Sequence, residues 1–409
     1  MKIFGDLQLH SKFSRACSKY ITLDKMEEFA RIKGLGLLST ADFQHPIWNK
    51  EIKQNLEEDD RGILWSKTKF PFIWGSEVSL MYSDNGRRAV HLLMFAPNRG
   101  VADQMIDVLS KKGRLDYDGR PIFGMSCPEF VELMKEINDD IEIITAHSFT
   151  PFFGVVGSKS GFDSLEECFK DKVNKIYAIE SGMSADPDMV RLISKLDKFN
   201  ILSFSDAHSF YPWRIGREAT KFDLKDLSYK NILKSMRTGN GVEETIEVDP
   251  SYGRYHIDGH RNCGIFIEPR ETKKLNGICP KCNKPLTIGV LSRILDLADR
   301  EKSVNVPKFK KLIPLTELIA AVYDIKQLGS KRIWNVYNKL IKYFGNELNV
   351  LLNAEETKLK AVVDAKLVDV IMKNREGKLR IKPGYDGVYG EVILDDKSRV
   401  SSQAKLSGF

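Results

Sequence analysis

The sequence of 409 residues is poor in cysteine and contains no long hydrophobic segment. Three of its six cysteines, Cys17, Cys127 and Cys168, stand alone in the chain, which is not the spacing of a disulfide framework. No apolar run approaches the roughly 20 residues that cross a bilayer. The opening segment MKIFGDLQLH also lacks the basic and then apolar pattern of a signal peptide. We therefore expect a globular protein of the cytoplasm.

An excess of one charge is likewise absent from most of the chain. The formal net charge is +7, and residues 301–409 account for it with 20 Lys and Arg against 13 Asp and Glu. A basic C-terminal segment beside a neutral body is typical of proteins that bind a phosphate backbone. A solvated, lysine-rich surface explains the same charge equally well, so this pattern alone does not decide between them.

Residues 1–240 alternate between short apolar runs and amphipathic helical patterns. A helix is expected at Pro128–Ile137, whose apolar side chains share one face. This alternation predicts an α/β fold with a parallel sheet, closed or open. The expected strands are Ile3–Leu9, Leu35–Ser39, Phe72–Trp74, Val90–Phe95, Ile141–Thr145, Lys175–Ile179 and Ile201–Phe204.

The remainder of the chain has two further compositions, so a 409-residue chain of several domains is expected. Residues 241–290 are rich in Gly, Pro, Arg, His and Cys, which predicts a small metal-binding insert. Residues 291–409 are mainly helical, with an apolar stripe from Trp334 to Phe344 that predicts a core. The Gly-rich, aromatic segment Lys382–Gly390 is either an ordinary turn, which we favour, or a loop that clamps a nucleic-acid backbone.

Polar side chains follow the ends of several expected strands. In a β/α barrel the C-terminal strand ends carry the catalytic residues, so we expect these side chains to converge. Mixed imidazole and carboxylate ligands suit Zn²⁺ or Mn²⁺, and bridging carboxylates allow more than one ion. Each histidine alone is explained by a structural role, but their common location favours a metal centre. The residues concerned are Gln8, His10, Asp42, Glu77, His147, Asp206 and His208, with His91 as a further ligand.

A second metal site is expected in the insert. His260-Arg-Asn-Cys263 and Cys279-Pro-Lys-Cys282 supply the four ligands of a tetrahedral structural zinc. His256 is the competing fourth ligand, and the alternative to any zinc site is a set of unrelated reduced cysteines.

The order of these motifs resembles the polymerase-and-histidinol-phosphatase (PHP) superfamily. That superfamily opens with His-x-His, where this chain has Gln8-Leu-His10, and continues with Thr-Asp-His, where this chain has Thr40-Ala-Asp42-Phe-Gln-His45. Phe43 stands where a ligand histidine is expected, so Asp42 or His45 takes over that role. The resemblance implies a distorted seven-stranded β/α barrel in residues 1–240 that holds two or three metal ions.

Further segments resemble the archaeal endonuclease Q family within that superfamily. They are Gly36-Leu-Leu-Ser-Thr-Ala-Asp42-Phe-Gln-His45-Pro, Glu180-Ser-Gly-Met-Ser-Ala-Asp186-Pro, Ser205-Asp-Ala-His208 and the cysteine cluster, and the resemblance covers nearly the whole chain. It implies incision of DNA on the 5′ side of deoxyuridine, deoxyinosine, deoxyxanthosine and abasic sites. The alternatives are a phosphatase of small phosphate esters and a non-catalytic DNA-binding protein, the latter suggested by Gln8 and Phe43.

The resemblance and the strand ends together suggest roles for individual residues. Metal-activated water is expected to attack the phosphodiester, with Asp206, Glu77 and His147 as catalytic residues. Zn²⁺ is expected at the structural site and at the catalytic site, where Mg²⁺ or Mn²⁺ would also fit. The substrate-binding candidates are Glu180, Ser181, Arg214 and Arg217.

The C-terminal end of the sequence resembles clamp-binding peptides. Gln403, Leu406 and Phe409 match the first three anchor positions of such peptides, and the chain stops where a second aromatic residue would come. This tail is either a peptide that binds a sliding clamp or a frayed polar terminus, and the sequence leaves both interpretations open.

Overall fold

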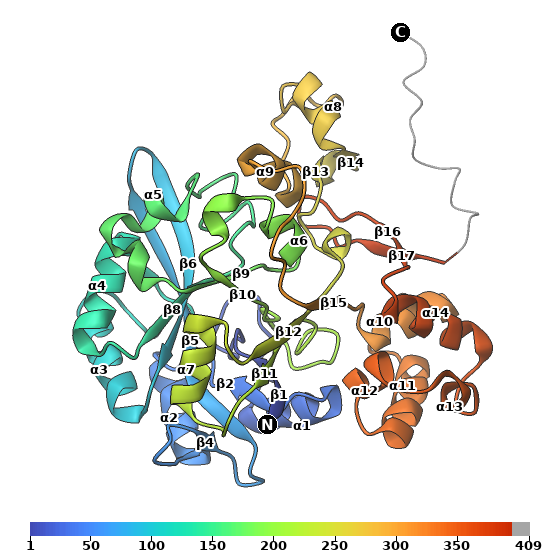
Figure 1. Ribbon diagram of the computed structural model, residues 1–409, viewed down its shortest axis with the longest axis horizontal. Helices are drawn as coiled ribbons and strands as arrows, with labels where there is room; N and C mark the ends of the chain where they lie inside the picture. The colour runs from blue at the N-terminus through green and yellow to red at the C-terminus, as the bar shows by residue number, and fades with distance from the viewer. Residues whose placement is uncertain (395–409) are drawn as a thin grey trace.

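The computed structural model describes residues 1–394 (Figure 1). The expected clamp-binding residues Gln403, Leu406 and Phe409 lie outside the described residues. No helix within residues 1–394 is long and apolar enough to cross a membrane.

One large sheet organises the first three quarters of the chain. Its hydrogen-bonded path follows the order β10 (Asn200–Leu202), β9 (Ala178–Glu180), β8 (Glu142–Thr145), β6 (Arg87–Ala96), β5 (Pro71–Ser83), β2 (Leu37–Ser39), β1 (Lys2–Asp6), β11 (Ala219–Asp223), β12 (Val242–Glu247) and β15 (Phe309–Lys311). Three short strands, β3 (Glu57–Glu58), β4 (Leu64–Trp65) and β7 (Ile122–Phe123), branch from this path.

The sheet is mixed rather than parallel throughout. The pairs β1–β2, β2–β5, β8–β9 and β9–β10 are parallel, as expected. The long strand β6, however, pairs antiparallel with both β5 and β8, and β11 pairs antiparallel with β1. The expectation of a purely parallel sheet is therefore wrong, because β5 and β6 form a hairpin whose turn lies near Asn85 and Gly86.

The sheet curls until its distant members meet. Beyond the ends of β1 and β10, Leu9 and Ala207 form a parallel bridge, and the amide of His10 donates to the carbonyl of Ala207 at 3.1 Å. This contact brings Gln8 and His10 beside Asp206. The α/β class is confirmed, whereas the count of seven strands stays a prediction, since the paired path has ten.

Alternating residues of the strands belong to two hydrophobic cores, one on each face of the sheet. Leu37 and Ile73 join a cluster that includes the buried face of α7 (Tyr229–Thr238), whereas Leu38 and Trp74 belong to a cluster on the other face. The surrounding helices are α1 (Leu23–Lys33), α2 (Pro46–Asn55), α3 (Arg99–Ser110), α4 (Cys127–Ile137), α5 (Leu165–Phe169) and α6 (Pro187–Val190).

Helix α4 shows how the local sequence determines where a helix begins and which of its faces is buried. A capping box joins Ser126 and Glu129 at its start, and Pro128 occupies the first turn, where its missing amide hydrogen is not needed. Phe130 and Met134 are buried on one face, so the helix expected at Pro128–Ile137 is confirmed.

The C-terminal region is mainly helical, as expected. It contains α10 (Leu315–Tyr323), α11 (Lys331–Phe344), α12 (Glu347–Leu352), α13 (Glu356–Lys360) and α14 (Ala365–Arg375), which lie together at one side of the sheet (Figure 1). Tyr337 and Leu340 of α11 are fully buried in their own core, so the apolar stripe is structural.

A smaller unit stands apart from the sheet at the top of Figure 1. It comprises β13 (Asp258–His260), β14 (Ile265–Ile267), α8 (Pro269–Lys274) and α9 (Val290–Leu297). The hairpin of β16 (Arg380–Lys382) and β17 (Glu391–Ile393) returns to this unit, because the Asp386 carboxylate accepts hydrogen bonds from the Arg261 amide and the Thr287 hydroxyl.

Candidate active site

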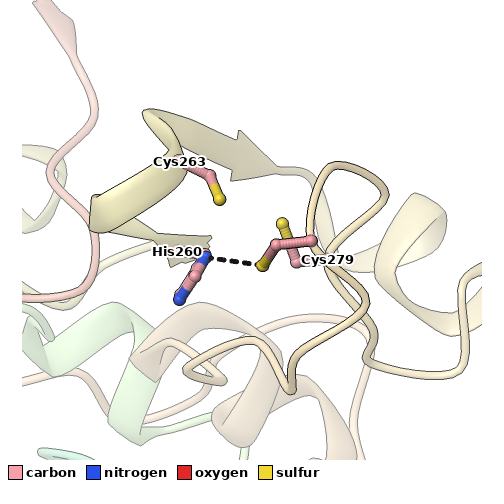
Figure 2. Close-up of side chains that lie close together, drawn as sticks. His260, Cys263 and Cys279 are labelled. Carbon is pink, nitrogen blue, oxygen red and sulfur yellow. Dashed lines mark hydrogen bonds between the residues drawn. The ribbon is translucent and has the colours of Figure 1, made fainter.

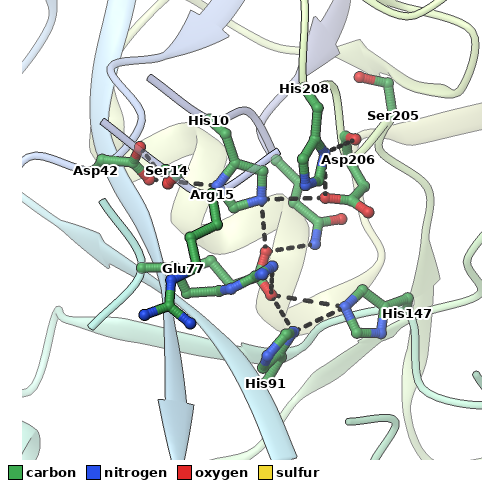
Figure 3. A network of polar contacts seen from close by, with 12 residues as sticks. His10, Ser14, Arg15, Asp42, Glu77, His91, His147, Ser205, Asp206 and His208 are labelled. Atoms are coloured by element: carbon green, nitrogen blue, oxygen red, sulfur yellow. Dashed lines mark hydrogen bonds and ion pairs between the residues drawn. The ribbon is translucent and has the colours of Figure 1, made fainter. Parts of the chain in front are cut away.

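Glu77 lies at the centre of a buried group of histidines and carboxylates (Figure 3). It sits in the middle of β5 rather than past a strand end, because β5 continues to Ser83. Its Oε1 lies 2.5 Å from Nδ1 of His91 and 3.5 Å from Nε2 of His147. Its Oε2 lies 3.1 Å from Nε2 of His10. Glu77 therefore faces two sets of histidines at once.

Two triads of possible metal ligands result from this arrangement. One comprises His10, Asp206 and His208, and the other comprises Glu77, His91 and His147. Ligands around a tetrahedral zinc ion stand about 3.3 Å apart, given Zn–N and Zn–O distances near 2.0 to 2.1 Å. The separations in the second triad, 2.5, 3.1 and 3.5 Å, bracket that value. The donor set and its spacing fit a transition-metal ion.

Three of the histidines are oriented by contacts at their outer nitrogen, Nδ1. Nδ1 of His10 lies 3.4 Å from Asp42, and Nδ1 of His208 lies 3.0 Å from the carbonyl of Asp206. Nδ1 of His147 lies 2.7 Å from the Thr150 hydroxyl, which leaves Nε2 of the ring free to accept a metal. Such outer partners fix the tautomer of a metal-binding histidine.

The pKa shifts within this group of side chains indicate that it favours a bound cation. Burial alone would lower the pKa of His10, but hydrogen bonds to Asp206, Asp42 and Glu77 raise it well above its ordinary value. Burial would raise the pKa of Glu77, but His91 and Arg120 lower it well below its ordinary value. Both pKa shifts favour a positive charge among these carboxylates, which a bound metal ion would also supply.

Not every expected ligand joins the triads. Asp42 lies behind His10 and accepts hydrogen bonds from the Ser11 amide at 2.6 Å and the Ser14 hydroxyl at 2.8 Å. Gln8 donates its amide to Oε2 of Glu77 at 3.0 Å. His45 stacks on Phe13 with ring centroids 4.1 Å apart, and its side chain belongs to neither triad.

Backbone strain marks three of the site residues. Asp42, His147 and Asp206 have φ angles of 31°, 31° and 47°, in the left-handed region that most side chains avoid. Each lies two to four residues after the end of a strand of the sheet, so the chain turns sharply there and aims the side chain inward. Such strain often accompanies functional sites.

A cavity of about 490 Å³ opens beside the two triads. Arg214 and Arg217 line it, as does Glu180, whose carboxylate accepts the His147 amide at 2.5 Å. Ser181 does not line it, because its hydroxyl donates to the buried Glu247 carboxylate at 3.0 Å.

The structure adds cavity residues that sequence reasoning missed. Arg120 places Nη1 3.3 Å from Oε1 of Glu77, although it follows an ordinary-looking Asp118-Gly loop. Tyr389 accepts a hydrogen bond from Nη1 of Arg217 at 3.0 Å, and Arg214 and Arg254 lie over its ring. The Gly-rich segment Lys382–Gly390, expected to be an ordinary turn, therefore also forms part of the cavity wall.

The predicted zinc ligands lie together in the smaller unit (Figure 2). The ligand atoms of His260, Cys263, Cys279 and Cys282 are all within 4.8 Å of one another, and Nδ1 of His260 is 3.4 Å from Sγ of Cys282. His256, the competing ligand, instead lies 3.3 Å from the carbonyl of Ser184. Zinc at this cluster stays a prediction.

Comparisons with known proteins give the family. Residues 314–378 match the family model of the MJ0043 C-terminal domain. The uncharacterized protein MJ0043 of Methanocaldococcus jannaschii is 33% identical over 271 residues, which cover 63% of this chain and 33% of that protein, so the chain spans about a third of its length. The uncharacterized protein YqxK of Bacillus subtilis (strain 168) is 30% identical over 412 residues, covering 96% of this chain and 99% of YqxK.

Two crystal structures match almost the whole chain at 31% identity. One is the lesion-specific endonuclease PfuEndoQ from Pyrococcus furiosus, with a TM-score of 0.86 over 99% of this chain and 98% of the other. The second is endonuclease Q in complex with a 27-mer duplex substrate with an abasic lesion at the active site, with a TM-score of 0.88 over 99% of this chain and 100% of the other. The chain belongs to the endonuclease Q family.

Membership in the endonuclease Q family confirms the resemblance inferred from the sequence and the expectation of an endonuclease. The expected archaeal origin stays a prediction, since YqxK comes from a bacterium.

Proposed function

We propose that this member of the endonuclease Q family hydrolyses DNA on the 5′ side of deaminated bases, namely deoxyuridine, deoxyinosine and deoxyxanthosine, and of abasic sites. The observation that carries the proposal is the cavity itself. Two members of each ligand triad line it, His91 and His147 of one and Asp206 and His208 of the other, together with several arginines. Its volume, about 490 Å³, is in the range of pockets that enclose small molecules, and an extruded nucleotide is of that size.

The ligand triads are proposed to hold two metal ions, Zn²⁺ or Mn²⁺ by the mixture of imidazole and carboxylate, with Mg²⁺ as a third possibility. The chemistry that such ions supply is activation of the attacking water and stabilisation of the departing 3′ oxygen. Glu77 lies between the triads, with one oxygen near His91 and the other near His10, so Glu77 or Asp206 would be the carboxylate shared by ions held at both. Asp42 and Thr150 act through His10 and His147, whose rings they orient.

The cavity wall binds the substrate in this proposal. Arg214 and Arg254 present guanidinium groups beside the triads and hold the phosphate oxygens. Arg217 is buried and tied to the Ser205 carbonyl and Tyr389, so it stiffens the wall. Burial raises the pKa of Glu180 well above its ordinary value, and its Oε1 lacks a hydrogen-bond partner. A protonated Glu180 would donate to the carbonyl that deamination creates on the base.

A nicking assay tests the proposal. Labelled duplexes with one deoxyuridine, deoxyinosine or abasic site are incubated with the protein and Zn²⁺, Mn²⁺ or Mg²⁺, beside an undamaged duplex. We expect one cut on the 5′ side of each lesion and none in the control. Asp206→Asn should abolish cutting and leave DNA binding within about twofold, because the phosphate contacts come from other residues.

The same assay distinguishes the two alternatives. Release of phosphate from small esters without cutting of any duplex would identify a phosphatase. Tight binding to lesion duplexes without cutting, in all three metals, would identify a non-catalytic DNA-binding protein. Cutting of damaged and undamaged duplexes at the same rate would contradict the proposed lesion specificity.

A further inference from the structure

Phe152 is a large apolar side chain exposed at the edge of the cavity. It is 45% exposed, lines the cavity, and contacts Tyr255 edge to face with ring centroids 6.1 Å apart. It lies five residues after His147, in the loop that follows β8. An exposed phenylalanine ring beside an active site presents a flat apolar face, which is suited to stacking on a partner that is apolar and flat.

The backbone that carries Phe152 is held rigidly. The neighbouring Phe153, at a φ of 63°, stacks on the His91 ring at 4.1 Å, and its carbonyl accepts the His91 amide at 2.9 Å. Gly157 packs so closely that an added Cβ would lie 2.0 Å from the Thr150 carbonyl oxygen. Phe153 is therefore packed inward against His91, a candidate metal ligand, whereas Phe152 faces outward.

The smaller unit holds the same loop from its other side. Arg293 donates to the carbonyl of Val156 at 2.8 Å, and Ser158 donates to the carbonyl of Ile288 at 2.9 Å. Residues 147–162 contain Lys159 and no carboxylate. The loop is thus fixed, apolar at its tip and free of negative charge, three properties that suit contact with a DNA duplex.

We propose that Phe152 fills the gap that the lesion nucleotide leaves in the base stack when it enters the cavity. The inference rests on the proposed function. Extruding a nucleotide exposes the faces of the two adjacent base pairs, and the lost stacking is unfavourable. A rigid aromatic side chain at the cavity edge covers one of these faces and offsets that cost. Phe152 is therefore a positioning residue for paired lesions rather than a catalytic residue.

Two substrates distinguish a role of Phe152 in filling the base stack of a duplex from a general role in incision. The first is deoxyuridine paired with adenine in a duplex, and the second is the same deoxyuridine in a single strand, which needs no extrusion. Phe152→Ala should slow single-turnover incision of the duplex at least tenfold and change single-strand incision less than twofold. Phe152→Trp should restore duplex incision to within about threefold of the parent. The control variant is Tyr343→Ala, which removes a 59% exposed aromatic side chain from α11.

A second measurement does not require cutting. In the Asp206→Asn background, which should bind DNA without cutting it, a thymine beside an abasic site in a duplex is oxidised by permanganate because one of its faces is unstacked. Binding of the parent protein and of Phe152→Trp should protect that thymine, whereas binding of Phe152→Ala at saturation should not.

The outcomes are distinguishable. If the parent protein cuts no damaged DNA, the proposed function fails, and the permanganate result still decides whether Phe152 enters the stack. Equal slowing of duplex and single-strand incision, no slowing of either, or protection by Phe152→Ala would overturn the role of Phe152 alone.

Discussion

At the scale of single residues, the site depends on groups that hold other groups in place. Asp42 and Thr150 orient the rings of His10 and His147, and Gln8 donates to Glu77. Arg120 differs, because it brings a positive charge into the cavity, 3.3 Å from Oε1 of Glu77. That charge can attract a phosphate oxygen, and it also repels a metal ion at the neighbouring triad.

Removing the Arg120 charge should therefore lower the rate of nicking and raise the affinity of the site for a metal ion. We expect Arg120→Met to slow single-turnover nicking roughly 100-fold, as loss of a charge-stabilising group commonly does. We expect the same variant to bind Zn²⁺ more tightly in calorimetric titration, since a nearby like charge is gone.

The matched control is Arg15→Met, whose side chain is 74% exposed and pairs with Asp118. Equal nicking rates for the two variants would contradict a catalytic role for Arg120.

Glu247 gives the fold a pH dependence. Burial raises its pKa to about 7, although the hydroxyls of Thr245, Ser203 and Ser181 donate to it and lower the pKa in part. A raised carboxyl pKa contributes stability that is complete below the unfolded value near 4.5 and is lost as pH rises through about 7. The loss between these limits is on the order of 3 kcal/mol.

The test compares urea unfolding at pH 5 and pH 8. The parent should lose stability over this interval, and Glu247→Gln, which cannot ionise, should lose clearly less. The exposed Glu301→Gln should behave as the parent does. Identical pH dependence in all three proteins would show that ionisation of Glu247 has no effect on stability.

At the scale of elements, the cysteine cluster supports the cavity from a distance. The cluster holds β13 and the turn at Cys279 together, and Asp386 joins this unit to the hairpin that carries Tyr389. Tyr389 in turn contacts Arg217 in the cavity wall. A change in the smaller unit is therefore expected to reach the active site through this hairpin.

Cys279→Ser should lose one zinc per chain, because a serine hydroxyl is a weak ligand beside thiolates. Elemental analysis measures the zinc, and limited proteolysis should then cut within residues 255–289, which the parent protects. Nicking should fall as a later consequence. Cys168→Ala, at a buried cysteine outside the cluster, is the control and should keep its zinc. If Cys279→Ser retained its zinc, the prediction of a structural zinc site at this cluster would be wrong.

At the scale of the whole molecule, one buried ion pair joins the sheet region to the C-terminal helices. Nζ of Lys33, at the end of α1, lies 2.7 Å from Glu347 in α12 and also donates to the carbonyl of Pro212. Glu347 accepts further bonds from the Leu315 amide and the Tyr337 hydroxyl. Since Pro212 precedes Arg214 by two residues, this contact links the docking of the helices to the cavity wall.

Breaking the pair from one side leaves a buried charge unpaired. Lys33→Met should destabilise the protein by roughly 3–5 kcal/mol and increase hydrogen exchange in residues 209–214. The double variant Lys33→Met with Glu347→Gln should recover part of this loss. The exposed pair Lys358–Glu355 serves as the control, and Lys358→Met should cost less than about 1 kcal/mol. Additive effects in the double variant would mean that the two residues are not coupled.

Much of this molecule follows from local sequence. The helix at Pro128–Ile137 was predictable because its cap, first-turn proline and apolar spacing are all local. The stripe from Trp334 to Phe344 was predictable as core for the same reason. The metal-ligand candidates were found because they follow or lie within recognisable apolar runs, and the cysteines because each pair is close in sequence.

Tertiary structure alone decided the partners of these residues. The antiparallel path of β6 depends on long-range pairing, which strand periodicity does not specify, and it placed Glu77 within a strand. Arg120 and Tyr389 reach the cavity across 43 and 172 residues from their partners Glu77 and Arg217. His45 and Asp42 look equivalent as ligands in sequence, yet the turn at Asp42 directs only Asp42 toward His10. Local sequence sets which residues are polar, buried or helical, whereas chain closure over long separations sets which of them meet.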